Sequence, residues 1–249
     1  MSGGELSCES LGVEGRLRDV SLTLESGSVT AICGPNGAGK STLLGCLAGL
    51  VSPDAGMVRV GGQRLDEVPL SRRARRIGYL PQSPEIAWDV AVEVLVSLGR
   101  IPWKGAPRGD DLQAIEQAIS EMDLERLRHR RVLQLSGGER ARALMARVLA
   151  TRPNWLLADE PLANLDLAHA AALAARLRAQ AARGRGVVLV LHDLATAMNH
   201  ADRVIVLDRG ALAADGPART ALSEDTIWKV WGVECRWLGE PGRRALSLE

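Results

Sequence analysis

Short runs of apolar residues alternate with stretches of helical periodicity along most of this chain. Residues 29–33, 156–158 and 187–191 are almost entirely apolar, as expected for strands that are covered on both faces. Residues 18–24 alternate between polar and apolar side chains, which predicts a half-buried strand. Buried strands separated by helices are typical of a parallel sheet covered by helices. The pattern therefore predicts an α/β protein with a mostly parallel core sheet.

Two regions depart from this alternation. The turn Asp208-Arg209-Gly210 joins two short apolar runs, which predicts a hairpin that closes the core. Residues 84–131 have a helical pattern, and four of their side chains fall on one apolar stripe. The stripe consists of Leu112, Ile115, Ile119 and Met122. We expect one main domain over residues 1–225, a helical subdomain inserted at about 84–150, and a short tryptophan-containing accessory segment at 226–249.

Composition narrows the possible partners and compartments. The 31 Lys and Arg residues nearly balance the 30 Asp and Glu residues, so nucleic acid is not an expected partner. The four cysteines are scattered without a CxxC pair, which favours a reducing compartment over a disulfide framework or a zinc site. The N-terminus has no secretion signal, and no apolar run reaches the ~18 residues of a membrane span. We expect a chain that neither crosses a membrane nor is exported.

A glycine-rich loop follows the strand at residues 29–33 and precedes a predicted helix. It satisfies the phosphate-loop pattern GxxxxGK[ST], in which small residues let backbone amides wrap around phosphate groups. Lys40 is expected to reach the β- and γ-phosphates, and the Ser41 hydroxyl to bind Mg²⁺. The predicted ATP-binding residues of this loop are Gly34, Pro35, Asn36, Gly37, Ala38, Gly39, Lys40, Ser41 and Thr42.

Two adjacent carboxylates, Asp159 and Glu160, end the buried strand at residues 156–158. Ligands of parallel sheets gather at the carboxyl ends of strands, so Asp159 is expected beside Ser41, where it holds Mg²⁺ through water. Glu160 is then placed to polarise the water that attacks the γ-phosphate. The alternative is that one carboxylate caps the turn before Pro161.

The segment Leu135-Ser-Gly-Gly-Glu139 opens a predicted helix. Ser136 and Glu139 form an S-x-x-E capping box, which many ordinary helices share. Gly137 and Gly138, however, each lower helix propensity by about 1 kcal/mol relative to Ala. Such a cost indicates close backbone approach to another group, and a helix N-terminus attracts anions. The expected anion is a γ-phosphate.

These motifs in this order resemble the ABC ATPase family, whose signature LSGGQ appears here as LSGGE. The resemblance implies a P-loop fold with an antiparallel N-terminal β part. It also implies roles for three further residues. Gln82 matches the Q-loop that contacts the metal and nucleotide, Asp166 matches the D-loop, and His192 matches the switch histidine that acts with Glu160 in catalysis.

The family resemblance further implies that two copies form a head-to-tail dimer, with each ATP between one phosphate loop and the signature of the other copy. Residues 88–103 resemble importers for siderophore iron, haem and cobalamin, which use polytopic permease subunits and a substrate-binding protein. The expected location is therefore peripheral, at the cytoplasmic face of the inner membrane. The alternative is a soluble ABC ATPase scaffold, as in iron-sulfur cluster assembly.

Two features fit the family less directly. Residues 6–28 lack the aromatic side chain that usually stacks on adenine. The base is instead expected to meet Val13 or Leu17, or a guanidinium from Arg16 or Arg18. The arginine-rich run at residues 71–76 suggests nucleic acid or anionic lipid, but is predicted to be a solvated face that needs no partner.

Overall fold

The computed structural model describes residues 4–84 and 88–248, and its central sheet has six strands. These are β3 (Val29–Cys33), β6 (Ile77–Leu80), β7 (Trp155–Asp159), β8 (Gly186–Val190), β9 (Arg203–Asp208) and β10 (Ala211–Pro217). Their order is β10-β9-β3-β8-β7-β6. All neighbours pair in parallel except β9 and β10, which form the predicted hairpin. Its turn places Arg209 and Gly210 at φ values of 47° and 82°, as a tight hairpin requires.

A second, antiparallel sheet covers one side of the molecule. It contains β1 (Leu6–Val13), β2 (Leu17–Leu24), β4 (Ala55–Val60) and β5 (Gln63–Arg64) in the order β2-β1-β4-β5. Helix α1 (Lys40–Ala48) packs between the two sheets, and its leucines Leu43, Leu44 and Leu47 are fully buried. The 3₁₀ turn η1 (Leu65–Glu67) and α2 (Leu70–Arg76) connect this sheet to β6. The predicted α/β fold with an antiparallel N-terminal part is confirmed.

The central strands separate two apolar clusters. In β3, Ala31 belongs to the cluster under the helices on one face, whereas Ile32 belongs to the cluster that surrounds α1. This double burial explains why the strand is apolar at nearly every position. The first cluster is covered by α5 (Gly137–Ala150), α6 (Leu167–Ala182) and α7 (Leu194–His200).

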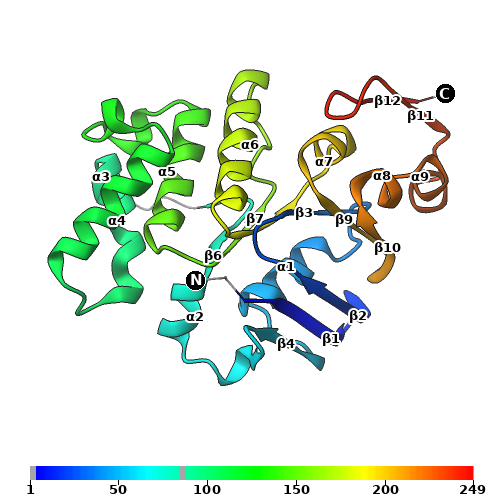
Figure 1. The fold of residues 1–249 in the computed structure, drawn as a ribbon, viewed down its shortest axis with the longest axis horizontal. Helices are drawn as coiled ribbons and strands as arrows, with labels where there is room; N and C mark the ends of the chain where they lie inside the picture. Colours follow the sequence, from blue (N-terminus) through cyan, green and yellow to red (C-terminus); the bar gives the residue numbers. More distant parts are fainter. Residues whose placement is uncertain (1–3, 85–87, 249) are drawn as a thin grey trace.

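A helical region is inserted in the chain between β6 and β7. It contains α3 (Val92–Ser97), η2 (Leu98–Trp103), α4 (Arg108–Glu121), η3 (Glu125–Leu127), η4 (Val132–Gln134) and α5. Its helices α3, α4 and α5 lie at the left in Figure 1. Residues 85–87 of the predicted insertion lie outside the described residues. The predicted stripe on α4 is wrong at its first member: Ile119 and Met122 are fully buried, but Leu112 is 53% exposed. Leu112 points the same way as Ile119 but lies two turns nearer the helix start, where neighbouring elements do not cover it.

The C-terminal segment folds onto the main core. It contains α8 (Ala218–Ala221), α9 (Glu224–Trp231) and the two-stranded sheet β11 (Cys235–Leu238) and β12 (Ala245–Leu248). Trp231 and Trp237 pack against the first cluster, and the Trp237 indole donates to the Leu222 carbonyl at 2.7 Å. The proposed boundary at residue 226 falls inside α9, because the Ser223 hydroxyl caps that helix. Among the helices of the described residues, none combines the length and hydropathy that crossing a bilayer demands.

Candidate nucleotide site

The carboxyl ends of β3, β7 and β8 bring the predicted phosphate-binding and catalytic residues together. These three strands are neighbours and run in parallel, so the segments that follow them meet at one edge of the sheet. A cleft of about 560 Å³ lies there, and we call it the phosphate cleft. It is lined by Arg16, Asn36, Gly37, Ala38, Gly39, Lys40, Ser41, Thr42, Gln82, Glu160 and His192.

The glycine-rich loop wraps tightly before α1. Gly39 has a φ of 98°, and a Cβ atom there would lie 2.6 Å from the Arg16 carbonyl oxygen, so only glycine fits. The Lys40 ammonium group donates to the carbonyl oxygens of Gly34 at 2.8 Å and Pro35 at 2.9 Å. Burial lowers the pKa of Lys40, and the Glu160 charge opposes that shift. The loop therefore concentrates a buried cation and backbone amides in one place.

Asp159 fits a metal site. It is 4% exposed, and its Oδ1 atom is buried without a hydrogen-bond partner. Desolvation raises the pKa of Asp159, and the neighbouring Ser41 hydroxyl opposes the shift. A carboxylate oxygen without a partner beside a hydroxyl is a donor set that suits Mg²⁺. Across residues 4–84 and 88–248, no cluster of three or more His, Cys, Asp and Glu side chains offers a complete metal site.

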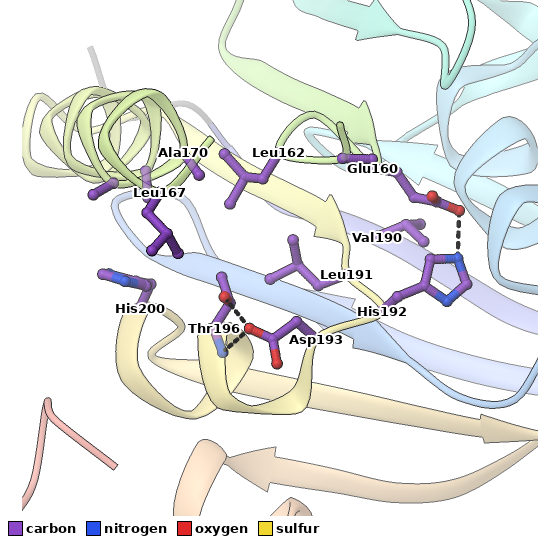
Figure 2. A pocket seen from close by; sticks show the side chains of 13 residues that line it. Glu160, Leu162, Leu167, Ala170, Val190, Leu191, His192, Asp193, Thr196 and His200 are labelled. Carbon is purple, nitrogen blue, oxygen red and sulfur yellow. Dashed lines mark hydrogen bonds and ion pairs between the residues drawn. The ribbon is translucent and has the colours of Figure 1, made fainter. Parts of the chain in front are cut away.

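Glu160 and His192 form a pair at the mouth of the cleft. The Glu160 Oε1 and His192 Nε2 atoms are 2.5 Å apart (Figure 2). The Glu160 side chain is 13% exposed and that of His192 is 45% exposed. Glu160 has a φ of 50°, in the left-handed region that L residues seldom occupy, and its amide donates to the Val190 carbonyl at 3.2 Å. Such backbone strain is often stored at functional sites.

The signature segment starts α5 with the predicted capping box. The Ser136 amide donates to the Glu139 carboxylate at 2.8 Å, and the Glu139 amide donates to the Ser136 hydroxyl at 3.3 Å. The Ser136 amide lowers the pKa of Glu139. A Cβ atom on Gly138 would lie 2.1 Å from the His169 ring, whereas one on Gly137 would meet nothing within 4 Å. The close approach at Gly138 is therefore to His169, and the predicted phosphate contact is left to the exposed Gly137.

The predicted site residues do not all meet in one cleft. Ser136 and Gly138 do not line the phosphate cleft. Gly137 lines a neighbouring cavity of about 190 Å³, the signature cavity, together with Gln82, Arg140 and Glu160. Asp166 caps α6, where its carboxylate accepts the His169 amide at 2.8 Å, and this bond lowers the pKa of Asp166. The structure thus separates the signature from the phosphate loop of the same chain.

No motif in the sequence singled out His169, and Arg16 was left as one of four candidates for contact with the base. His169 packs on Gly138 from 31 positions away, and only its spacing of three from Asp166 hinted at a shared helix start. Among the four candidates for the base, Arg16 lines the phosphate cleft. The Arg18 guanidinium is instead held by the Arg209 carbonyl at 3.0 Å, and Leu17 is buried.

An apolar pocket of about 430 Å³ adjoins the pair of Glu160 and His192 (Figure 2). It lies between α6 and α7, with Leu162, Leu167 and Leu191 among its lining residues. Asp193 caps α7 at this pocket by accepting the amides of Ala195 and Thr196. The cap fixes the start of α7 two residues after His192.

A phosphate loop, a buried carboxylate beside its serine, a Glu-His pair and a capped glycine signature on this fold define an ABC-type ATPase. Residues 17–163 match the family described as ABC transporter, and the chain belongs to that family. It is an ATP-binding subunit whose family couples ATP hydrolysis to transport.

Its curated relatives narrow the subfamily. The chain is 42% identical to the hemin import ATP-binding protein HmuV of Rhodococcus jostii, over 87% of this chain and 74% of the relative. It is 45% identical to the protein of that name from Nocardia farcinica, over 90% and 78% of the two chains. These relatives favour an importer subunit over the soluble scaffold that was the alternative.

Solved structures share the whole fold. A metal-chelate type ABC transporter in an inward-facing conformation superposes with a TM-score of 0.83 at 25% identity, covering 98% of this chain and 96% of that one. The cbiO1 subunit of Clostridium perfringens, part of the cbiONQ transporter complex, gives a TM-score of 0.81 at 25% identity, over 90% and 92% of the two chains.

Proposed function

We propose that this chain is the ATP-hydrolysing subunit of an importer for haem, with siderophore-bound iron and cobalamin as the related cargo classes. The observation that carries the proposal is the meeting of the phosphate loop, Glu160 and His192 in one cleft of an ABC ATPase. The cargo follows from the relatives, which are named for hemin import.

Nucleotide binding begins with an exchange at Lys40. Its ammonium group leaves the Gly34 and Pro35 carbonyls for the β- and γ-phosphate oxygens, which offer stronger, charge-assisted hydrogen bonds. The amides of the loop and the N-terminus of α1 bind the remaining phosphate oxygens. Arg16 lines the same cleft, and we assign its guanidinium to cover the base.

Three side chains would hold Mg²⁺: the Ser41 hydroxyl, the Asp159 carboxylate and the Gln82 amide oxygen. The ion would neutralise phosphate charge during transfer. The buried, unpartnered Oδ1 atom of Asp159 supports this assignment, because a carboxylate is otherwise costly to bury.

Hydrolysis depends on Glu160, which is positioned to accept a proton from the attacking water. His192 holds the Glu160 carboxylate through Nε2 and, being half-exposed, can also reach a bound γ-phosphate. The strained backbone at Glu160 fixes the carboxylate at the end of β7.

The complete site would need a second copy of the chain. Ser136, Gly137 and Gly138 start a helix of 14 residues. The exposed Ser136 and Gly137 would meet the γ-phosphate bound by the other copy in a head-to-tail dimer, whereas Gly138 is buried against His169 and keeps the turn in place. Asp166 would lie at the same interface. A twofold arrangement makes two equivalent sites at once.

In this proposal the ATPase acts at the cytoplasmic face of the inner membrane, bound to polytopic permease subunits that receive cargo from a substrate-binding protein. The ATPase domain ends before Ser223, which caps α9, rather than at residue 225, and the segment from α9 onward is accessory. The helical insertion at about 84–150 contacts the permease. Nucleic acid has no role.

Purification of the tagged chain from detergent-solubilised membranes tests the proposal. We expect a polytopic membrane protein to co-purify, and the complex reconstituted in vesicles to accumulate haem only with ATP and only with Glu160 intact. Soluble partners alone would replace the importer with the scaffold. Uptake of cobalamin or a ferric siderophore in preference to haem would retain the importer and change its cargo.

A further inference from the structure

A second charged pocket lies at the opposite end of the sheet from the phosphate cleft. The Asn154 amide donates to the Arg76 carbonyl, which holds the amino ends of β6 and β7 together. Beside them, a pocket of about 380 Å³ opens between α2, η2 and the start of α4. We call it the cationic pocket, because four of its lining side chains are Arg75, Arg100, Lys104 and Arg152. Asp110 is the carboxylate in its lining.

Among the described residues, a carboxylate pairs with one of the four cations, Arg100. Arg100 is 8% exposed, and its Nε atom lies 2.7 Å from the Asp111 carboxylate while Nη1 donates to the Ala150 carbonyl. Within the part of the chain that the structure describes, no ion pair joins a carboxylate to Arg75, Lys104 or Arg152. The cationic pocket therefore concentrates positive charge in a chain whose net charge is only +1.

The arginines are held in place before any ligand arrives. Arg75 donates through Nε to the Pro102 carbonyl at 2.8 Å, and its guanidinium carbon lies 4.6 Å from the centre of the Trp103 ring. The Trp103 indole is itself fixed by the Thr151 carbonyl at 2.8 Å. Arg152 has a φ of 55°, and its Nε atom is buried without a hydrogen-bond partner. A buried donor without a partner is unfavourable, so Arg152 lacks an acceptor at the edge of this pocket.

These contacts correct the interpretation of the arginine-rich run as a solvated face. Arg72 is exposed, as predicted, but Arg75 is partly buried and fixed against Trp103. Arg73 is likewise partly buried and donates to the Gly49 carbonyl. The run therefore builds structure and lends one guanidinium to the cationic pocket.

We propose that the cationic pocket binds a phosphate ester. Guanidinium groups match phosphate with paired, charge-assisted hydrogen bonds, and several cations suit a group that carries up to two negative charges. The start of α4, a helix of 14 residues, adds its positive end. The volume of about 380 Å³ is that of a small-molecule site and exceeds the need of a simple ion. Trp103 and Pro107 provide an apolar wall for the carbon part of the ester.

The phosphate ester has two possible sources: a soluble metabolite or the headgroup of an anionic lipid. Calorimetric titration with glycerol 3-phosphate probes the first, and flotation with phosphatidylcholine vesicles containing phosphatidylglycerol probes the second. Both are run with saturating Mg-ADP, so that the phosphate loop is already filled. Succinate is the matched dicarboxylate probe.

We expect glycerol 3-phosphate or the anionic vesicles to bind, and Lys104→Ala and Arg75→Gln each to weaken that binding about tenfold or more. Arg72 lies on α2 with Arg75 but outside the pocket, so the Arg72→Gln variant should bind the probe as the wild type does. Lys104 is exposed and contributes no ion pair, so Lys104→Ala tests the pocket without disturbing the fold, and its ATP hydrolysis should be unchanged.

Binding of the soluble ester identifies a metabolite site, and binding of vesicles alone identifies a lipid headgroup site. Three results would overturn the proposal: no binding of either probe, equal loss of binding in Arg72→Gln, or succinate binding as tightly as glycerol 3-phosphate. The last result would make the pocket a carboxylate site.

Discussion

Replacing Glu160 with Gln separates catalysis from stability, because the two effects have very different sizes. Loss of a general base typically lowers a rate by 10²- to 10⁴-fold, or about 2.7–5.4 kcal/mol of barrier. The Glu160 side chain also contacts His192, whose side chain is 45% exposed, so solvent screening limits that pair to about 1 kcal/mol or less. Glutamine keeps the shape and can still accept a hydrogen bond from Nε2 of His192.

We therefore expect ATP hydrolysis to fall at least about a hundredfold while the melting temperature shifts by no more than about 4 °C. ATP affinity should be retained, since Lys40 and the loop amides are untouched. The measurements are steady-state phosphate release, equilibrium nucleotide binding and thermal unfolding of the same preparation. Asp208→Asn is the matched control: it makes the same chemical change at the end of β9, outside the phosphate cleft.

Hydrolysis by Glu160→Gln at near the wild-type rate would remove Glu160 from the role of base. A rate loss that Asp208→Asn reproduces would instead attribute the effect to general charge removal at this edge of the sheet. A large drop in melting temperature would mean that the pair with His192 is mainly structural.

Three further predictions follow from particular contacts. In the Glu160→Gln background, Ser136→Arg should abolish the ATP-trapped dimer seen by size-exclusion chromatography, and unchanged dimer formation would disprove the cross-dimer signature contact. Because the proposal assigns Arg16 rather than an aromatic ring to the base, ATP and GTP should bind within about tenfold of each other, and a preference for ATP of about a hundredfold would refute that assignment. At about pH 8 a thiol reagent should modify half-exposed Cys235 rapidly and the buried cysteines only after unfolding, since burial raises their pKa values. The pKa values are about 11 for Cys8, about 12 for Cys33 and about 11 for Cys46. Fast labelling of any of these three cysteines in the native protein would contradict their burial in the core.

Much of this fold could be predicted from the sequence because the buried strands and the phosphate loop are local patterns. The run at residues 29–33 is apolar since β3 is covered on both faces, and the turn at Arg209 and Gly210 is set by local chemistry. The capping box of Ser136 and Glu139 likewise lies within one turn of helix. Each of these features depends on residues that are close in sequence.

The remainder depended on contacts between distant residues. Periodicity places Leu112 on the apolar stripe of α4, but it does not show that no neighbouring element covers this end of the helix. Gly138 is explained by His169, which another helix supplies. The choice of Arg16 over Arg18 required knowing that the hairpin turn at Arg209 holds the second guanidinium, 191 residues away. No local pattern carries that information.

The phosphate cleft and the signature cavity share two lining residues, which links the nucleotide site to the helical region. Gln82 and Glu160 line both the phosphate cleft and the signature cavity. Gln82 follows β6 at the point where the chain leaves the sheet for the helical region, whose last helix carries Gly137. A ligand that draws Gln82 toward the phosphate cleft must therefore change the signature cavity as well. The chain's own Gly137 lines the signature cavity. We therefore expect movement of Gln82 to alter the angle at which α5 is presented to another copy. This movement would link bound nucleotide to the helical region during the proposed closure of the dimer.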